Sequence, residues 1–504
     1  MILVMQCCGL CRTAERKFFM QEKMQKLKQV LQSTYFYTIY LFFVRNFRKV
    51  RKGLKKMRKS IRRSVRRTFD PLYKWYVFKH LYPRVYAKHA AKPVDETKVV
   101  FVELRLPKLT NSFKVLYDTL YRDYDFDIHC HFLRNTYVSR REYRKNVKAM
   151  LADIATAKYV FFDEATNVNG CFKMREETVV TQLWHGCGAF KKFGFSTADA
   201  IFGASREQME KYPFNRNYTR VTVSSPEVIW AYEEAMQYSS ESGVVQALGS
   251  SRTDIFYDQK VIDKAYENLY ALMPQAKGKK VILYAPTFRG RVAKATTPRV
   301  LIPEFMKYEL GDDYVLLFKH HPLVRKRPKI SDFCADFAMD VTDTMTIEDL
   351  LCVADICISD YSSLVFEYSL FEKPMLFLAH DLENFFDWRG FYYDYNELAP
   401  GPIVENTTGV IDFIKHIDER FDRKRVHEFR KKFMLSCDGH ATERIMLDAF
   451  GKEALDAHRR AEPLEDLPYH DVPHSNDYTE PEDEDEDEDA AAEEEANKKA
   501  EPEE

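Results

Sequence analysis

The chain contains 504 residues, with a formal net charge of −1 and a hydrophobic fraction of 45%. This apolar fraction excludes a chain that is disordered as a whole, and the length predicts two or three domains at roughly 150 residues each. The ten cysteines lack the repeated paired spacing of a zinc site or a disulfide framework, which indicates a reducing compartment.

Residues 1–95 are predicted to form a basic and aromatic helical region that associates with a membrane. Residues 45–67 hold thirteen Lys or Arg and no acidic residue, and apolar side chains recur among them every three or four positions. This spacing predicts a helix with one apolar stripe and a cationic remainder, which is typical of a helix lying on an anionic lipid surface. The alternatives are a nucleic-acid-binding arm and a solvated helix packed on its own protein. The aromatic run at 35–43 favours the membrane, and we expect no nucleic-acid partner.

No apolar stretch of the sequence approaches the roughly 20 residues that a membrane-spanning helix needs. The first ten residues also lack the basic leader and the small-residue cleavage site of a secretion signal. We therefore expect a peripheral protein on the cytoplasmic face of the cell membrane.

Residues 96–243 are predicted to form a first Rossmann-like domain, because apolar strand-like runs alternate there with segments of helical spacing. We predict strands at 99–104, 127–133, 159–165 and 179–186, and helices at 112–123 and 140–157. The last of these strands ends in His185, which precedes Gly186. A histidine at the carboxyl end of a strand, before glycine that lets a ligand approach the backbone, is well placed for proton transfer. A lone histidine is otherwise more often structural.

Residues 221–254 are interpreted as the connection between two similar halves, with Arg252 in a polar turn beside the cleft. The second Rossmann-like domain is predicted at 244–425, with closing helices at 426–462. Its predicted strands lie at 281–286, 314–322, 337–342, 354–359, 373–380 and 402–406. Two doubly wound α/β domains that face each other are typical of the GT-B glycosyltransferase fold. Residues 463–504 form an acidic, low-complexity tail that we expect to be disordered.

The segment at 349–377 carries the main functional signal of the chain. Its strand ends at Asp360, and Ser362 and Ser363 follow where a helix begins, so that hydroxyls and unpaired amides meet at one point. This arrangement predicts a phosphate site at the carboxyl edge of a parallel sheet. The alternative is that the two serines only cap the helix.

Thr287, Arg289 and His321 also follow predicted strands of the second domain. Because the carboxyl ends of parallel strands share one edge of a sheet, we expect these side chains to converge with Ser362. Hydroxyl, guanidinium and imidazole groups together suit the diphosphate of a nucleotide. No G-x-G-x-x-G or P-loop motif occurs, and no carboxylate cluster demands a metal. We therefore predict no cofactor, although a divalent cation is compatible with such a site.

Several motifs, taken in order, resemble the CDP-glycerol glycerophosphotransferase family of teichoic acid synthesis. They are WHG, GSSRTD, YAPTFR, FKHHP, ISDYSS with FEY, KPMLF, WRGFYYDY and GPIV, within residues 99–450. The resemblance implies a GT-B enzyme that transfers glycerol 3-phosphate from CDP-glycerol to an acceptor hydroxyl and releases CMP. It also implies an undecaprenyl-diphosphate-linked acceptor and attachment to the inner membrane leaflet through basic helices, which agrees with the interpretation of residues 45–67.

The resemblance also assigns roles to residues of this sequence. It makes His185 the candidate general base and His321 a phosphate contact or a second proton-transfer group. Arg289 would bind a diphosphate oxygen, while Asp360 would bind a glycerol or ribose hydroxyl or merely brace its turn. His320 is expected to be structural. The other predicted donor-binding residues are Thr287, Ser362 and Ser363, and the predicted borders of the cleft are Gly186, Arg252, Arg389 and Gly390.

The sequence departs from the common family pattern at two places. Gly-Cys-Gly at 186–188 stands where many relatives have Gly-Thr-Pro, and the turn at 250–253 also differs. These changes leave the acceptor preference open, as well as the choice between one added unit and many. The alternatives are a CDP-ribitol enzyme, a capsule-polymer enzyme, a nucleotide-sugar glycosyltransferase and, from another class, a non-catalytic membrane-binding scaffold. The sequence predicts no oligomeric state.

Overall fold

The computed structural model describes residues 23–26, 57, 69–135, 137–200, 203–290, 295–383, 385 and 390–465. The chain forms two compact units, 1–75 and 76–504. Residues 23–26 and 69–75 of the first unit are helical, whereas most of the predicted membrane region and nearly all of the acidic tail lie outside the described residues. Among the residues described, no helix is long and apolar enough to cross a membrane.

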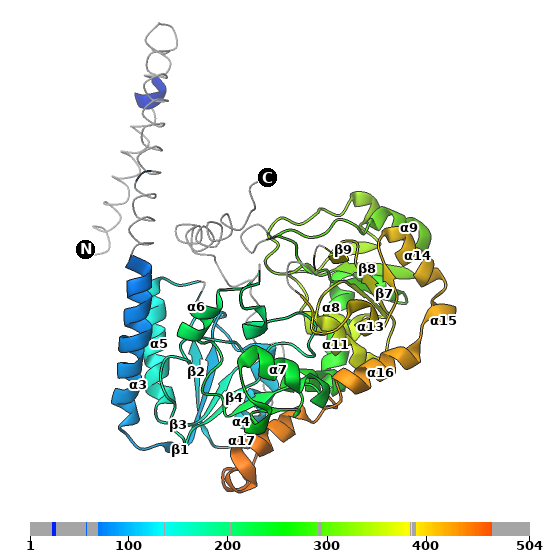
Figure 1. The fold of residues 1–504 in the computed structure, drawn as a ribbon. Coiled ribbons are helices and arrows are strands. Elements are labelled where there is room, and N and C mark those ends of the chain that lie inside the picture. Colours follow the sequence, from blue (N-terminus) through cyan, green and yellow to red (C-terminus); the bar gives the residue numbers. More distant parts are fainter. Residues whose placement is uncertain are drawn as a thin grey trace, which may run out of the picture. The chain divides into compact units, whose positions relative to one another are not determined.

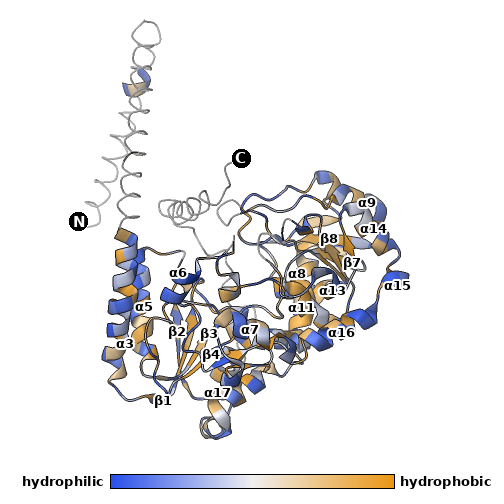
Figure 2. Ribbon diagram, viewed as in Figure 1, coloured by the Kyte–Doolittle hydropathy of each residue, from blue (hydrophilic) through white to orange (hydrophobic). Residues whose placement is uncertain are grey.

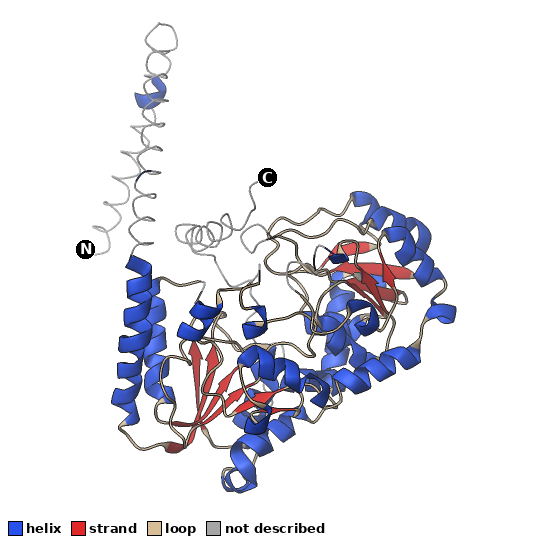
Figure 3. Cartoon of the chain, viewed as in Figure 1, coloured by secondary structure: helices blue, strands red, loops and turns tan. Residues whose placement is uncertain are grey.

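The second unit contains two parallel β-sheets, drawn in red in Figure 3. The first sheet has the strand order β2-β1-β3-β4-β5-β6. Its strands are β1 (Asp95–Glu103), β2 (Asp127–Phe132), β3 (Ala157–Phe162), β4 (Val179–Gln182), β5 (Arg220–Thr222) and β6 (Val245–Gln246). The helices α4 (Asn111–Asp123) and α5 (Arg140–Ile154) connect the first three strands, so the predicted alternation of four strands and two helices is confirmed. Both faces of the sheet are covered, which explains the continuous apolar runs in β1 and β3.

The segment interpreted as a connection between the halves, 221–254, contributes two further strands to this first sheet. β5 has three residues and β6 has two, and β6 lies just past the domain boundary predicted at 243. Strands of this length are too short to show a period-two pattern, so the sequence carries no signal for them.

The C-terminal helix α17 (Ala441–Ala457) completes the core of the first sheet. Its Phe450 is buried with Phe101 and Phe161 of β1 and β3, and its ring centroid lies 5.9 Å from that of Phe161. Figure 1 shows the chain running through α16 (Arg423–Phe433) to α17 beside the first sheet. The predicted closing helices therefore return the chain to the sheet where it began.

The second sheet has the order β12-β11-β10-β7-β8-β9. Its strands are β7 (Lys280–Tyr284), β8 (Tyr314–Phe318), β9 (Ala338–Asp340), β10 (Ile356–Ser359), β11 (Met375–Leu378) and β12 (Ile403–Val404), which confirms the six predicted strands. The helices around it are α8 (Gln259–Leu272), α9 (Pro303–Leu310), α10 (Ile347–Val353), α11 (Leu364–Tyr368) and α14 (Thr407–Lys415). Buried Ile282, Leu316, Ile358 and Leu376 form its core, and Figure 2 shows these strands in orange.

The order of the second sheet reverses between β7 and β10. From β7 the chain adds β8 and β9 on one side, and it then returns to add β10, β11 and β12 on the other side. In a parallel sheet such a reversal opens a crevice at the carboxyl ends of the two central strands, where ligands of α/β proteins bind. The described chain also contains η1 (Val77–Leu81), α3 (Tyr82–Ala90), α6 (Arg206–Lys211), α7 (Ile229–Met236), α13 (Tyr395–Leu398) and α15 (Ile417–Arg420).

Candidate functional site

His185 lies on a sharp turn at the carboxyl end of β4. The preceding Trp184 has φ +58°, a left-handed conformation that costs a bulky residue about 1–2 kcal/mol, and its N–H donates to Gln182 Oε1 at 3.0 Å. His185 Nδ1 lies 3.1 Å from the carbonyl oxygen of Asp163. Because a carbonyl can only accept, Nδ1 carries the proton and Nε2 keeps its lone pair. With the side chain 41% exposed, Nε2 can serve as a proton acceptor.

The pKa of His185 reflects two opposed effects. Partial burial in the turn lowers the pKa, while the carboxylate of Glu164 raises it. The result is an imidazole that is neutral near pH 7, which a general base requires.

Two glycines bring the His185 turn against the start of α11 in the second half. A Cβ added to Gly186 would lie 3.6 Å from Ser363 Oγ. Gly188 has φ +65°, and a Cβ there would lie 2.5 Å from the ring of Phe366 on α11, so only glycine fits. The predicted residues His185, Gly186 and Ser363 are therefore neighbours, although they come from different sheets.

Arg252 was predicted to border the cleft, and the structure places it against the same turn, largely buried. It belongs to the 3₁₀ helix η5 (Ser251–Tyr257), and its guanidinium donates to the carbonyl oxygen of His185. It also lies 2.8 Å from Glu348 Oε1 on α10 and 3.1 Å from Glu367 Oε1 on α11. The Arg252 side chain is only 12% exposed. Burial raises the pKa of Glu367, and the Arg252 charge opposes this.

Ser362 and Ser363 stand at the start of α11, as predicted. Ser362 Oγ accepts the N–H of Leu364 at 3.4 Å, a long hydrogen bond. Ser363 is the N-cap, and within the described residues its hydroxyl makes no capping hydrogen bond. Capping alone therefore does not account for the serine pair, and both side chains are partly exposed.

Arg289 and Asp360 form an ion-pair network at the ends of β7, β10 and β11. Arg289 lies 2.6 Å and 2.9 Å from the two oxygens of Asp381 and 2.9 Å from Asp360 Oδ2, and it donates to Thr287 O at 2.7 Å. Asp360 is 1% exposed, and its Oδ1 accepts the N–H groups of Thr287 and Tyr361 at 2.8 Å and 2.6 Å. Burial lowers the pKa of Arg289, but the contacts with Asp381 and Asp360 together outweigh it and raise the pKa.

The network gives Arg289 a different setting from the one expected. The guanidinium is already bound by two carboxylates, so a diphosphate contact would require these ion pairs to open. For Asp360, the geometry fits the bracing alternative, because both oxygens are engaged within the protein. The hydroxyl of Thr287 is buried and has no hydrogen-bond partner within the described part of the chain.

His321 follows β8 and faces cations from the first half of the unit. Its Nδ1 accepts the N–H of Leu323 at 3.2 Å, so Nε2 carries the proton in the neutral ring. Burial, with Lys191 and Arg105 nearby, lowers the pKa of His321 to about 4. A neutral Nε2–H donor beside two cations suits a phosphate oxygen.

Lys191 and Arg105 were not among the predicted site residues. The signal that could have found them is the one used for His321, because Arg105 closely follows β1 and Lys191 lies beyond the end of β4. Carboxyl ends of parallel strands gather at one edge, so basic residues placed there are candidates for anion contacts.

Gly390 lies beside the segment that carries Lys191 and Lys192. Gly390 has φ +77°, and its carbonyl oxygen accepts the N–H of Lys192 at 3.1 Å. Arg389 lies outside the described residues. His320 is buried and lies 3.0 Å from Thr297 Oγ1 through Nδ1, which agrees with the structural role expected for it.

The described residues contain no group of three or more His, Cys, Asp or Glu side chains that could hold a metal ion.

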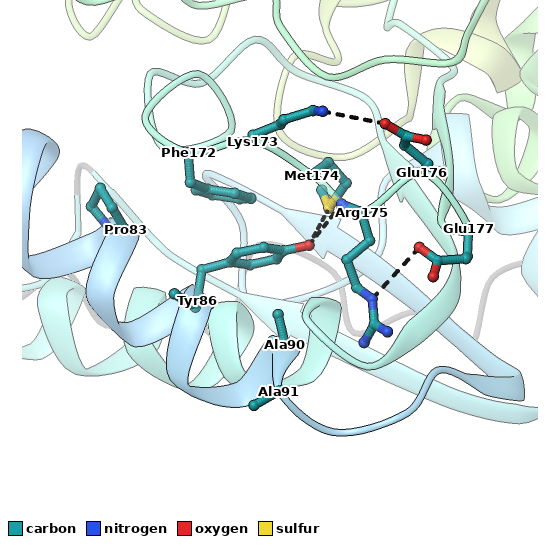
Figure 4. A pocket seen from close by; sticks show the side chains of 11 residues that line it. Pro83, Tyr86, Ala90, Ala91, Phe172, Lys173, Met174, Arg175, Glu176 and Glu177 are labelled. Carbon is teal, nitrogen blue, oxygen red and sulfur yellow. Dashed lines mark hydrogen bonds and ion pairs between the residues drawn. The ribbon is translucent and has the colours of Figure 1, made fainter.

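A pocket of about 1070 Å³ lies away from the His185 turn, between α3 and the loop at 172–177 (Figure 4). There Tyr86 stacks on Phe172 at 4.1 Å, and its hydroxyl contacts Met174 Sδ at 3.3 Å. This loop precedes β4 while His185 follows it, so the pocket lies at the opposite edge of the first sheet.

The chain is similar in sequence to a known protein family and to several of its bacterial members. Residues 84–450 match the family described as CDP-Glycerol:Poly(glycerophosphate) glycerophosphotransferase. The chain is 34% identical over 362 residues to the teichoic acid ribitol-phosphate primase of Bacillus spizizenii, covering 71% of this chain and 91% of that protein. It is 31% identical over 283 residues to the teichoic acid glycerol-phosphate transferase of Staphylococcus aureus, covering 54% and 71%.

A solved structure of the wall teichoic acid polymerase TagF is similar in fold. It aligns with a TM-score of 0.61 at 20% identity, covering 80% of this chain and 99% of that chain. The two parallel sheets found here are therefore shared with a solved structure.

Proposed function

This chain belongs to the CDP-glycerol:poly(glycerophosphate) glycerophosphotransferase family, a group of bacterial cell-wall transferases of teichoic acid biosynthesis, and we propose that it transfers a polyol phosphate from a CDP-linked donor to an acceptor hydroxyl. CMP is the leaving group. The predicted donor is CDP-glycerol. A second candidate is CDP-ribitol, which is favoured by the longer and more similar alignment with a ribitol-phosphate primase than with a glycerol-phosphate transferase.

The observation that carries the proposal is the meeting of the His185 turn with the serine pair of α11. An added Cβ at Gly186 would lie 3.6 Å from Ser363 Oγ, so the backbone that carries His185 lies against the serine pair. Transfer of a phosphoryl group to an alcohol needs these two kinds of group side by side, one to take a proton and one to hold phosphate oxygens.

In the proposed reaction the acceptor hydroxyl attacks the phosphorus that carries the polyol. A new P–O bond forms, the P–O bond to CMP breaks, and the hydroxyl proton passes to His185 Nε2. The hydroxyls of Ser362 and Ser363, with the amides at the start of α11, donate to phosphate oxygens. The neutral His321 contributes its Nε2–H, and nearby cations offset the charge of the diphosphate.

The acceptor is proposed to be an undecaprenyl-diphosphate-linked chain at the inner membrane leaflet. Support comes from the thirteen basic residues at 45–67, which suit an anionic lipid surface. The GT-B arrangement predicted from the sequence belongs to the same proposal, and it is supported by the fold shared with the polymerase TagF.

The test uses the purified full chain with membranes or a synthetic lipid-linked acceptor. Radiolabelled CDP-glycerol and CDP-ribitol are supplied separately, and the lipid products are separated by length. We expect transfer from one donor, and a fall of about 10²–10⁴-fold in the His185→Ala variant, which is the usual contribution of a general base. His416→Ala, at an exposed histidine between α14 and α15, is the matched control and should retain activity. Absence of transfer from both donors, with an acceptor proven competent, would overturn the proposal.

A further inference from the structure

Three acidic residues, Glu103, Asp163 and Glu164, follow one another at the carboxyl ends of β1 and β3, near the His185 turn. These two strands are neighbours at the point where the order of the first sheet reverses, and the residues after the paired Val102 and Phe162 are Glu103 and Asp163. Glu164 comes next in the chain. No prediction from the sequence fell on these acids.

Glu103 and Asp163 are fully buried and fix the backbone around them. Glu103 Oε1 accepts the N–H groups of Arg105 and Leu106 at 2.8 Å and 3.0 Å, and Asp163 Oδ2 accepts the hydroxyl of Thr110 at 2.5 Å. Glu103 Oε2 and Asp163 Oδ1 are buried without a hydrogen-bond partner among the residues described. Burial raises the pKa of both carboxyls, and the neighbouring Glu103 charge raises that of Asp163 further. The pair therefore holds a proton more tightly than exposed carboxyls do.

Glu164 has a different setting, because its carboxylate reaches the imidazole of His185. Oε1 lies 3.5 Å from His185 Nδ1, on the same side as the carbonyl oxygen of Asp163 at 3.1 Å. The Glu164 side chain is 17% exposed and also forms an ion pair with Arg105. Its backbone carbonyl accepts Gln182 Nε2 at 3.2 Å, which ties the ends of β3 and β4 together.

We propose that Glu164 is a positioning residue for His185. The carbonyl of Asp163 accepts the Nδ1–H, and the Glu164 carboxylate, 3.5 Å from the same nitrogen, holds the ring electrostatically, so that Nε2 points outward as the base. The carboxylate also stabilises the imidazolium formed when Nε2 takes the acceptor proton. This inference rests on the proposed function. It extends the proposed function by naming the residue that orients the base and stabilises its protonated form.

The charges around His185 make the role measurable. Glu164 raises the pKa of His185, while Arg105 and Arg252 lower it. Neutralising Glu164 removes the carboxylate that raises the pKa of His185 and that pairs with Arg105, so His185 must titrate at a lower pH and become a weaker base. A carboxylate at this distance shifts the pKa of a neighbour by about one unit or more.

The decisive variant is Glu164→Gln, which keeps the shape of the side chain and removes its charge. The matched control is Glu96→Gln, the same change at the opposite end of β1, where Glu96 pairs with Lys158 at the surface. We expect Glu164→Gln to lower kcat by about 10–100-fold, part of the general-base contribution, and to leave the donor KM near its original value. The acidic limb of the pH profile should move down by about one pH unit. Glu96→Gln should match the unmodified protein in both respects.

A profile for Glu164→Gln that superimposes on that of the unmodified protein would overturn the inference. So would an equal loss of activity with no shift of the acidic limb, because a purely structural role gives that result. A second readout needs no turnover: the NMR titration of the His185 ring in the full chain, assigned by comparison with His185→Ala. A lower His185 pKa in Glu164→Gln supports the inference, and an unchanged pKa refutes it. If neither donor is turned over, the proposed function fails while this titration still decides the role of Glu164.

Discussion

Replacement of Arg289 by methionine separates the structural role seen in the fold from the donor contact implied by the sequence. Methionine has a similar length and no charge. It removes the two contacts with Asp381 at 2.6 Å and 2.9 Å and the contact with Asp360 at 2.9 Å. Asp360 is 1% exposed and would then lie buried beside a neutral side chain.

The expected loss follows from the cost of leaving a buried charge without its partner, which is about 3–5 kcal/mol. The backbone N–H groups of Thr287 and Tyr361 still donate to Asp360 Oδ1 in the variant, and they limit this loss of stability. Because 1 kcal/mol shifts the melting temperature of a cooperative unit of about 150–250 residues by about 2–4 °C, we expect a fall of roughly 6–20 °C. The measurement is thermal denaturation of the full chain followed by circular dichroism.

The difference in melting temperature between the unmodified protein and Arg289→Met should become smaller as the pH falls. The Arg289 partner lowers the pKa of Asp381 against the opposing effect of burial. A carboxyl whose folded-state pKa is lowered contributes stability above its unfolded pKa of about 3.9, and this stability is lost as the pH falls through the folded value. The gap in melting temperature should therefore be full at pH 7 and narrow below about pH 4.

Asp381→Asn and the double variant serve as controls, because a shared ion pair makes the two substitutions less than additive. An Arg289→Met protein with an unchanged melting temperature and a donor KM raised by tenfold or more would refute the reasoning. In that case Arg289 would be a diphosphate ligand, as the sequence comparison first implied.

Two further substitutions test the contacts that hold the His185 turn. Gly188→Ala should lower the free energy of unfolding, measured by urea denaturation, by about 2–5 kcal/mol, because it combines a left-handed φ with a Cβ 2.5 Å from the ring of Phe366. Adding Phe366→Leu should recover only the part of this loss that is due to the steric clash. Full recovery would contradict the argument from backbone conformation. Arg252→Met should cost about 3–5 kcal/mol at pH 7, because the buried Glu348 and Glu367 lose their cation. The loss should shrink on acidification, because Glu367, whose pKa is raised by burial, takes up a proton; a loss that does not vary with pH would count against the ion-pair explanation.

Most of the strand and helix pattern could be predicted from the sequence. The apolar runs at 99–104, 281–286 and 354–359 predict buried strands, because a parallel sheet covered on both faces requires continuous apolar residues. Turn formers after these runs mark the carboxyl ends of the strands, which explains why His185, His321 and the serine pair could be named as candidates. The same local signals fail for β5 and β6, whose few residues carry no periodicity.

The partners of the charged groups were decided by the tertiary structure. Arg289 meets Asp381, which is 92 residues away in the chain, and Arg252 meets Glu348 and reaches the carbonyl of His185, 96 and 67 residues away. Glu164 becomes relevant only because β3 and β4 are neighbours and end at the same edge. For the longer strands, sequence alone indicates which side chains stand at strand ends, since backbone propensity and the apolar pattern are local properties. Which of them neutralise one another and which remain open to a ligand depends on strand order and register, because electrostatic contacts form between atoms a few ångströms apart, whatever their distance along the chain.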